Sequence, residues 1–240
     1  MVTVDEARKN ELLAALPERE LQRLLGLLHV KSLDLGESVY EAGEALQQVN
    51  FPTDCVVSLL NVLEDGATAE IAVVGFEGVV GIALFMGGAT TPSRAIAQSA
   101  GKCLVLGANH VRAEFSRGGP LQALLLRFTQ ALITQMAQTA ICNRHHSVDQ
   151  QLCRWLLLSL DRLRSNELRM TQQLIADMLG VHRVGVTAAA GKLDAAKIIE
   201  YARGRIRVLD RGRLEHSACE CYVVVKKEYD RLLHRGRDTA

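Results

Sequence analysis

The chain has 240 residues, 48% hydrophobic and 23% charged, a composition typical of a folded protein with one large domain or two modest ones. No apolar run approaches the roughly 18 residues that a membrane span needs, and the start, MVTVDEARKN, lacks the apolar core of a secretory signal. The net charge of +1 hides an asymmetry, since residues 1–119 hold 9 Lys/Arg and 15 Asp/Glu whereas residues 120–240 hold 19 and 12.

This asymmetry indicates that the C-terminal half of the chain faces a polyanion while the N-terminal half has another task. A basic face that is merely solvated would give the same count. Six cysteines are scattered at positions 55, 103, 142, 153, 219 and 221. Without an export signal or a membrane span, we expect them to be mostly reduced thiols and the protein to be cytoplasmic.

The N-terminal half predicts short helices followed by a compact β structure. LLAALPERELQRLLGLL reads as helices interrupted at Pro17. From about residue 30 to 115, short apolar or alternating runs such as VNFPTDCVVSLLNVL and RAIAQSAGKCLVLG are separated by glycines. Strands at this spacing, joined by turns such as Glu64-Asp65-Gly66, are typical of a sandwich or small barrel.

A long helix is predicted next. PLQALLLRFTQALITQMAQTAICNR follows Gly118-Gly119, and Pro120 suits the first helical position. Its apolar residues surround the helix axis, so the helix must be buried on more than one side. One side can pack on its own domain, and we expect the other to meet a second copy of the chain. Burial against several helices of the same chain is the alternative.

Two further helices and a tight turn are predicted after this long helix. Ser147 can cap one helix, with Gln150 at the reciprocal capping-box position. A short strand, ELRM, leads into TQQLIADMLG, where Thr171 can cap a helix and Gly180 can end it in the left-handed conformation. The expected buried stripe of that helix is Leu174, Ile175, Met178 and Leu179.

A second helix, with His182 and Arg183 at its exposed N-terminus, and a hairpin around Arg203-Gly204 follow. Because side chains alternate along a strand, Arg205 and Arg207 share one face of the hairpin. Helix, glycine turn, helix and basic hairpin together indicate a winged helix-turn-helix, whose second helix enters the DNA major groove and whose wing reaches the phosphates. The last segment, LEHSACECYVVVKKEYDRLL, predicts one amphipathic closing helix.

Over nearly its full length the sequence resembles the Crp/Fnr family of bacterial transcription regulators. The resemblance rests on GESVYEAGEAL, FEGVVGIALFMGG, the long helix and TQQLIADMLGVHRVGVTAAAGKL. It implies an α+β fold: an N-terminal antiparallel β-roll of the cyclic-nucleotide-binding type, with N-terminal helices, over residues 1–119, a dimerisation helix over 120–146 and a winged helix-turn-helix over 147–240. It also implies a homodimer that binds double-stranded DNA at a two-fold symmetric site, with RNA polymerase as a further partner.

The resemblance also assigns the DNA-contacting positions. Where the cAMP receptor protein type has Arg-Glu-Thr at the start of the reading helix, this chain has Arg183-Val184-Gly185, and Ala188 replaces a second base-contacting arginine. We expect Arg183 to contact guanine and Val184 and Ala188 to touch thymine methyls. The expected phosphate contacts are Thr171, Gln173, His182, Arg203, Arg205 and Arg207. Solvated side chains are the alternative for His182 and for the wing arginines, and a phosphate or solvent role is the alternative for Arg183.

The sensor region departs from family members that bind cyclic nucleotides. Ile82 stands where those members have a glutamate for the ribose hydroxyl, and Ser93-Arg94 reverses their Arg-Ser phosphate pair. Isoleucine would leave the hydroxyl unpaired, so we expect no ordinary cAMP binding. Ser93 and Arg94 remain candidate effector contacts, although a structural ion pair is the favoured role for Arg94. The effector is left unassigned.

No cofactor and no metal are expected. An iron–sulfur cluster needs several thiolates, and the β-like region holds only Cys55 and Cys103. Cys219 and Cys221 fall on a predicted helix, where two residues turn about 200°, so their thiols are expected to point to opposite sides. His145, His146 and Asp149, after the long helix, favour a polar hinge over a metal site.

No catalytic residue is expected either, and the chain is not predicted to be an enzyme. A cupin-like metal pocket needs clustered ligands, whereas the β-like region holds only His29 and His110. Neither a phosphate-binding loop nor a nucleophile elbow occurs. Two alternatives to an effector-controlled DNA-binding regulator stay open: a signalling module whose degenerate helix-turn-helix no longer binds DNA, and a DNA-binding regulator without a small-molecule effector.

Overall fold

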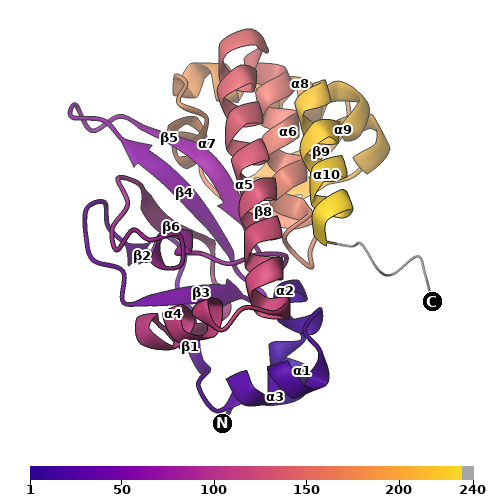
Figure 1. Cartoon of the computed structure of the whole chain (residues 1–240). Helices are drawn as coiled ribbons and strands as arrows, with labels where there is room; N and C mark the ends of the chain where they lie inside the picture. The colour runs from indigo at the N-terminus through magenta and orange to yellow at the C-terminus, as the bar shows by residue number, and fades with distance from the viewer. Residues whose placement is uncertain (234–240) are drawn as a thin grey trace.

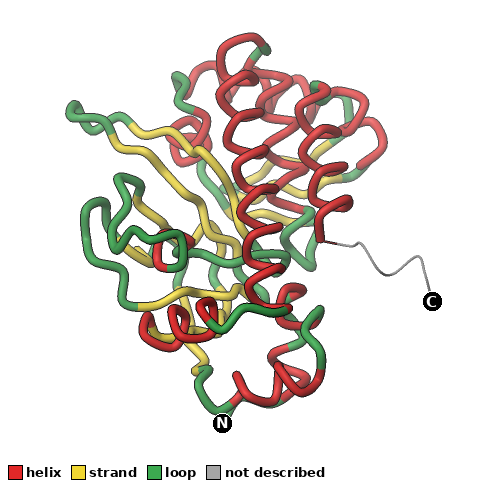
Figure 2. The backbone as a smooth tube through the Cα atoms, viewed as in Figure 1, coloured by secondary structure: helices red, strands yellow, loops and turns green. Residues whose placement is uncertain are grey.

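The structure is a computed structural model that describes residues 1–233 of the chain (Figure 1). Two antiparallel sheets form the N-terminal part, a helical part with one small sheet forms the C-terminal part, and the long helix α5 (Pro120–His145) stands between them. Figure 2 shows the longer strands on one side of α5 and helices packed along the other. The predicted α+β fold class is confirmed.

The N-terminal part begins with three short helices and continues as a roll of two sheets. The helices are α1 (Val4–Ala7), α2 (Glu11–Ala14) and α3 (Glu18–Leu25), with Pro17 at the predicted break. One sheet has the order β1 (His29–Leu33), β7 (Gly101–Gly107), β3 (Gln48–Pro52). The other has the order β2 (Ser38–Tyr40), β6 (Arg94–Ser99), β4 (Val56–Val62), β5 (Thr68–Val74). A 3₁₀ turn, η1 (Ile82–Leu84), and helix α4 (Ala108–Ser116) complete the roll.

Helix α5 starts where the sequence predicts. Gly118 and Gly119 have φ angles of 77° and 91°, values that L residues with a side chain rarely adopt, and Pro120 takes the first helical position. Helix α5 packs against β5 and against α10 (Glu220–Leu233), the last helix of the described residues. Within residues 1–233, no helix has both the length and the apolarity that crossing a bilayer requires.

The C-terminal part contains α6 (Val148–Leu160), α7 (Gln172–Leu179), α8 (Arg183–Ala195) and α9 (Arg211–Ser217) besides α10. Its sheet has the order β8 (Glu167–Arg169), β10 (Arg205–Val208), β9 (Ile199–Ala202). The predicted capping box at Ser147 and Gln150 is present, Thr171 caps α7, and Gly180 is left-handed with a φ of 64°. Local chemistry therefore fixes the ends of α6 and α7 as predicted.

Two expectations about helices are wrong. Leu174 is not part of the buried stripe of α7, since 36% of its surface is exposed, although its three expected companions are buried. The closing segment is also two helices rather than one, because the chain is extended at Ala218 (φ −80°, ψ 160°) between α9 and α10. Cys219 therefore lies outside the helix that contains Cys221, and the two thiols do not point to opposite sides.

A buried polar network joins the roll to the helices behind it. Arg162, just after α6, forms an ion pair with Glu77 of the roll, with its Nε 2.8 Å from Oε1. Its Nη2 donates to Gln135 Oε1 of α5 at 2.7 Å, and the Tyr229 hydroxyl of α10 donates to the same oxygen at 3.2 Å. The guanidinium carbon also lies 4.9 Å from the centre of the Tyr229 ring. One cation thus connects the roll, α5 and α10.

Glu70 of β5 gives stability a pH dependence. Burial raises the pKa of its carboxyl to about 7, although Ser58 Oγ donates to it. The folded state therefore favours the neutral carboxyl. The contribution of Glu70 to the free energy of unfolding is complete below pH 4.5 and is lost as the pH rises towards 7. We expect Glu70→Gln to leave stability near pH 5 almost unchanged and to raise it at pH 8 by about 2–3 kcal/mol.

Urea unfolding of the wild type and the variant at both pH values measures this difference. Glu64→Gln removes an exposed carboxylate from the β4–β5 hairpin and should change stability little at either pH. Equal effects of Glu70→Gln at pH 5 and pH 8 would contradict the assignment.

Candidate nucleic-acid interface

The N-termini of two helices and the hairpin turn line one open hollow on the C-terminal part. Its lining residues are Thr171, Gln172, Gln173, Arg183, Tyr201, Arg203 and Gly204. Thr171 is the N-cap of α7, and Arg183 is the first residue of α8. Because helix N-termini carry partial positive charge, this hollow suits phosphate oxygens. The structure thus brings Thr171, Gln173, Arg183 and Arg203 together, four of the residues expected to contact DNA.

Helix α8 presents a face with few large side chains. Val184 is 79% exposed, and Arg183, Thr187 and Ala188 also face solvent. The opposite side of the helix is buried through Val186, Ala189, Ala190 and Leu193. Its N-cap residue, His182, is exposed and makes no side-chain capping hydrogen bond. The start of α8 therefore offers backbone N–H groups and one arginine to a ligand.

The two expected contact residues of α7 already have partners within the domain. Thr171 Oγ1 accepts a hydrogen bond from the Leu174 N–H at 3.2 Å, and Gln173 Nε2 donates to Asp177 Oδ1 at 2.8 Å. Gln172 Oε1 accepts from the Thr187 hydroxyl at 2.7 Å, which joins α7 to α8. These bonds orient the residues that border the hollow.

The arginines of the hairpin are not equivalent. Arg203 and Gly204 have φ angles of 50° and 74°, a tight turn that puts Arg203 at the tip. Arg205 Nε lies 3.4 Å from Glu167 Oε1, and Arg207 Nη2 lies 2.5 Å from Glu200 Oε2. Within residues 1–233, neither Arg183 nor Arg203 has a carboxylate within 4.0 Å. Of the four arginines expected to contact DNA, Arg183 and Arg203 are thus the two without an ion pair among the described residues.

Sequence reasoning missed Gln172 and Tyr201, which also line the hollow. The Tyr201 hydroxyl donates to the Met170 carbonyl at 3.2 Å. Burial raises the pKa of Tyr201, and the positive charge of Arg183 opposes that shift. Tyr201 lies on β9, two residues before Arg203 of the turn, and its place next to the basic turn was the available signal.

The two candidate effector residues are in the roll, at the start of β6. Arg94 Nε lies 3.1 Å from Glu41 Oε2, which agrees with the structural ion pair that the sequence favoured. Ser93 is buried, and its Oγ lies 2.8 Å from Thr91 Oγ1. Ile82, at the position of the missing glutamate, packs against the apolar core. An anion bound at Arg94 would compete with Glu41.

The roll also touches the helix-turn-helix directly. The Thr68 hydroxyl of β5 donates to the Asp177 carbonyl of α7 at 3.1 Å. A Cβ atom on Gly180, at the turn between α7 and α8, would lie 3.3 Å from Ala69 Cβ. In Figure 1, β4 and β5 extend alongside α7. The β4–β5 hairpin is therefore in contact with the turn that precedes α8.

The Crp-like helix-turn-helix domain family matches residues 150–217. Among solved structures, FixK2 from Bradyrhizobium japonicum is 17% identical, with a TM-score of 0.69 over 80% of this chain and 98% of that one. A putative Crp/Fnr-family transcriptional regulator from Eubacterium rectale is 16% identical, with a TM-score of 0.67 over 87% and 98%. The c-di-GMP-responsive regulator CLP from Xanthomonas campestris is 15% identical, with a TM-score of 0.64 over 80% and 99%.

No curated protein sequence matches the chain. At these identities the structural likeness shows the fold, and the matched domain shows the kind of helix-turn-helix. The hollow, the second helix with its exposed N-terminus and the basic hairpin all lie within residues 150–217. Residues 150–217 thus form a Crp-like helix-turn-helix domain, and the chain as a whole shares its fold with a solved transcriptional regulator of the Crp/Fnr family.

Proposed function

We propose that the protein is a cytoplasmic homodimer that binds double-stranded DNA at a two-fold symmetric site and regulates transcription with RNA polymerase as a partner. In this proposal, residues 1–119 sense an effector, residues 120–146 dimerise and residues 147–240 bind DNA. The observation that carries it is the position of Arg183: exposed, without an ion pair in the described part of the chain, and beside two helix N-termini and the wing turn.

In the proposed complex, α8 enters the major groove N-terminus first. Arg183 forms two hydrogen bonds with one guanine, while Val184 and Ala188 contact thymine methyl groups. His182, Thr171, Gln173 and the wing arginines hold phosphates. Because the exposed face of α8 carries few large side chains, its backbone can approach the bases closely, and DNA deformability adds to selectivity.

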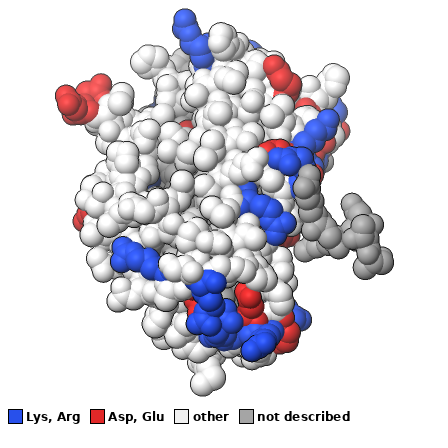
Figure 3. Space-filling model, viewed as in Figure 1, with Lys and Arg blue, Asp and Glu red and all other residues white. Residues whose placement is uncertain are grey.

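The proposed dimer forms along the exposed side of α5. Six exposed positions on this side recur at alternating spacings of four and three, the pattern of a two-stranded coiled coil. These positions are Leu126, Gln130, Ile133, Ala137, Ala140 and Arg144. Leu126 and Ile133 are 51% and 55% exposed, large fractions for apolar residues on a long helix. Figure 3 shows the face over α5 with few charged side chains, which gather at its edges and lower end.

The proposed sensor does not bind cAMP in the usual manner. The ion pair of Arg94 with Glu41 and the packing of Ile82 support this part of the proposal. Ser93 and Arg94 stay candidate contacts for an effector of another kind. A regulator controlled by its abundance alone would give no response to any added small molecule.

We expect Arg183→Ala to remove most sequence discrimination. One arginine–guanine pair contributes about 1–3 kcal/mol, so two half-sites together lose about 2–6 kcal/mol of operator affinity. Binding to random duplex should fall by much less, since the phosphate contacts remain. Fluorescence anisotropy with a duplex selected from a random pool, and with a scrambled duplex, at two salt concentrations measures both affinities.

Arg112→Ala is the matched control, because Arg112 is an exposed arginine on α4 of the roll. It should leave discrimination between the two duplexes unchanged. If the wild type binds neither duplex even at low salt, the chain is a module that has lost DNA binding. If Arg183→Ala keeps full discrimination, another residue reads the bases.

A further inference from the structure

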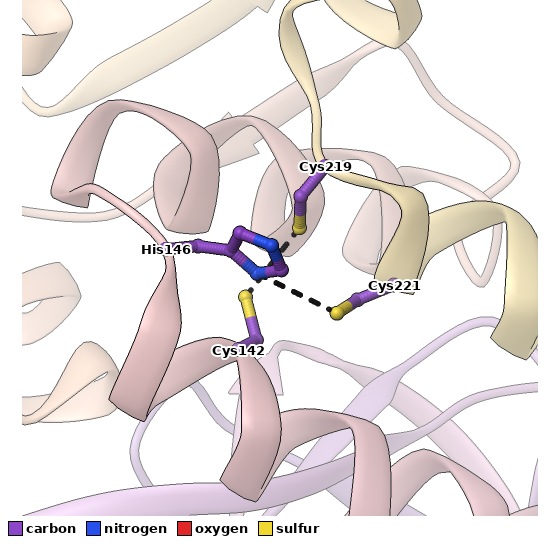
Figure 4. A group of neighbouring side chains, drawn as sticks. All are labelled: Cys142, His146, Cys219 and Cys221. Carbon is purple, nitrogen blue, oxygen red and sulfur yellow. Dashed lines mark hydrogen bonds between the residues drawn. The ribbon is translucent and has the colours of Figure 1, made fainter.

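Three thiols and one imidazole converge where α5 ends. Cys142 is in the last turn of α5, and His146 is the residue after that helix. Cys219 directly precedes α10, and Cys221 is in its first turn (Figure 4). One ligand atom from each of the four lies within 4.8 Å of all the others. Cys142 Sγ is 3.5 Å from Cys219 Sγ, and Cys221 Sγ is 3.6 Å from His146 Nδ1. The three cysteines are buried and His146 is partly buried.

These separations fit a tetrahedral zinc site. With Zn–S bonds of about 2.3 Å and Zn–N bonds of about 2.0–2.1 Å, a tetrahedron places two sulfurs about 3.8 Å apart and a sulfur and a nitrogen about 3.6 Å apart. Zinc prefers thiolate and imidazole ligands, and three cysteines with one histidine are a usual set for a structural zinc site. The cluster needs only small shifts to close around an ion.

We propose that Cys142, His146, Cys219 and Cys221 bind one Zn²⁺ ion in a closed, structural site. Binding deprotonates the three thiols and releases their protons to solvent, while His146 stays neutral and ligates through Nδ1. All four coordination positions come from the protein, so no position is left for a substrate or a reactive water.

The surroundings of His146 support ligation through Nδ1. Its other ring nitrogen, Nε2, lies 3.4 Å from Glu220 Oε2. A metal-bound imidazole usually donates its second N–H to a carboxylate or a carbonyl, which fixes the orientation of the ring. Gln151 Nε2 donates to the His146 carbonyl at 2.9 Å and to the Cys142 carbonyl at 3.5 Å. The backbone of two ligands is thus held from α6.

The charge near the cluster also fits. Zn²⁺ with three thiolates and a neutral imidazole carries one net negative charge, which is costly to bury without a counter-ion. Arg154 of α6 is 3% exposed, and its positive charge favours the thiolate forms of Cys142 and Cys221. Its Nη1 donates to Thr139, and its buried Nε has no hydrogen-bond partner. Among residues 1–233 no carboxylate lies within 4.0 Å of it, although its charge also acts on the buried Glu70 carboxyl. Arg154 is a ready counter-ion for the metal centre.

The site would fix the joint between α5 and the DNA-binding unit. The residues that follow His146 contact α8: a Cβ on Gly185 would lie 3.6 Å from Val148 Cγ1, and Asp149 Oδ2 lies 2.6 Å from Lys192 Nζ. A metal bound to Cys142 and His146 on one side and to Cys219 and Cys221 on the other ties α10 to this joint. The position of α8 then depends on metal occupancy.

The first test uses the full chain, purified reduced and without a polyhistidine tag. Metal analysis should find one zinc per chain. After chelation, Co²⁺ should bind in a one-to-one ratio and give the intense visible bands of tetrahedral cobalt with a thiolate-to-cobalt charge-transfer band. The proposal is overturned if the reduced wild-type chain holds no zinc and gives no such bands. It is also overturned if the chain holds iron and inorganic sulfide in place of zinc. A Cys142–Cys219 disulfide that forms while zinc is present would overturn it too.

Variants locate the ligands. Cys219→Ala and His146→Ala should abolish or strongly weaken Co²⁺ binding, and Glu220→Gln should weaken it about 10- to 100-fold. The matched controls are Cys153→Ala, a buried cysteine of α6 outside the ligand set, and His145→Ala, the exposed neighbour of His146. Both controls should keep the cobalt spectrum of the wild type.

Retention of that spectrum by Cys219→Ala would overturn the assignment.

Alkylation of the wild type, followed by mass spectrometry, gives a readout that does not depend on any variant folding. Zinc should protect Cys142, Cys219 and Cys221, and a chelator should expose these three in preference to Cys153. Equal labelling with and without the chelator would also overturn the site.

Discussion

Replacing Ile133 with aspartate is expected to convert the proposed dimer into a monomer and to weaken operator binding by about 10²–10⁴-fold. Ile133 lies in the middle of the exposed stripe of α5, so a two-fold axis would place two carboxylates close together in an apolar seam. A monomer holds one half-site and loses the effective concentration that links the two reading helices, which accounts for the size of the loss. Light scattering gives the mass, and anisotropy gives the affinity.

Met86→Asp is the matched control, because Met86 is a similarly exposed apolar residue (54%) that lies in the roll, just after η1, and not on α5. It should leave both the mass and the operator affinity unchanged. An Ile133→Asp protein that stays dimeric would show that α5 is not the dimer helix. A monomeric variant with wild-type operator affinity would show that dimerisation is not needed for binding.

The second large effect is expected from Arg162→Met, which should lower the free energy of unfolding by about 3–5 kcal/mol. Methionine fills much of the same space but leaves the Glu77 carboxylate buried without its cation. It also removes the donor to Gln135 Oε1, which then keeps only the Tyr229 hydroxyl. Burial already raises the pKa of Glu77, and Arg162 opposes that shift. Urea unfolding at pH 7 measures the loss.

The double variant Arg162→Met/Glu77→Leu separates pairing from packing. If the loss comes from an uncompensated carboxylate, the double variant should recover much of the stability, because it buries no charge. Arg162→Lys, which keeps the charge but not the planar group, should fall between the wild type and methionine. A double variant no more stable than Arg162→Met would show that the ion pair is not the source.

The parts of the fold that the sequence predicts well depend on neighbours in the chain. The capping box at Ser147, the cap at Thr171 and the left-handed Gly180 each satisfy backbone groups within about four residues, so the residue types alone reveal them. The turn at Arg203-Gly204 is of the same kind. The start of α5 also follows from local chemistry, since two glycines and a proline precede its first turn.

The parts that the sequence does not predict depend on residues far apart in the chain. Arg205 has an ion pair and Arg203 has none, because the pairing of β10 with β8 places Glu167 next to Arg205. No local sequence pattern reveals how these two strands pair. Leu174 is exposed because the packing of α7 covers only part of the predicted stripe. The roles of the expected DNA contacts, in contrast to their positions in the fold, stay predictions.

The cysteine and histidine cluster shows the same limit more strongly. Cys142 and Cys219 are 77 residues apart, and no ligand spacing in the sequence links them. The short distance between Cys219 and Cys221 argued against a metal site only while both were placed on one helix. Once the chain breaks at Ala218, the same spacing lets two thiols point towards one atom. The extended backbone at Ala218 therefore changes the interpretation of Cys219 and Cys221, from thiols on opposite sides of a helix to two ligands of one metal ion.

The contact of the β4–β5 hairpin with α7 has a consequence for how a dimer would answer to a signal. The Thr68 hydroxyl bonds to Asp177 of α7 in the same chain, so in the proposed dimer a movement of that hairpin would act on the helix-turn-helix of its own subunit. Each subunit of the proposed dimer would then respond on its own. A dimer with an effector bound to one subunit would have one altered and one unaltered helix-turn-helix. In the proposed dimer, this contact therefore gives each subunit its own path from the roll to the helix-turn-helix, besides any path through α5.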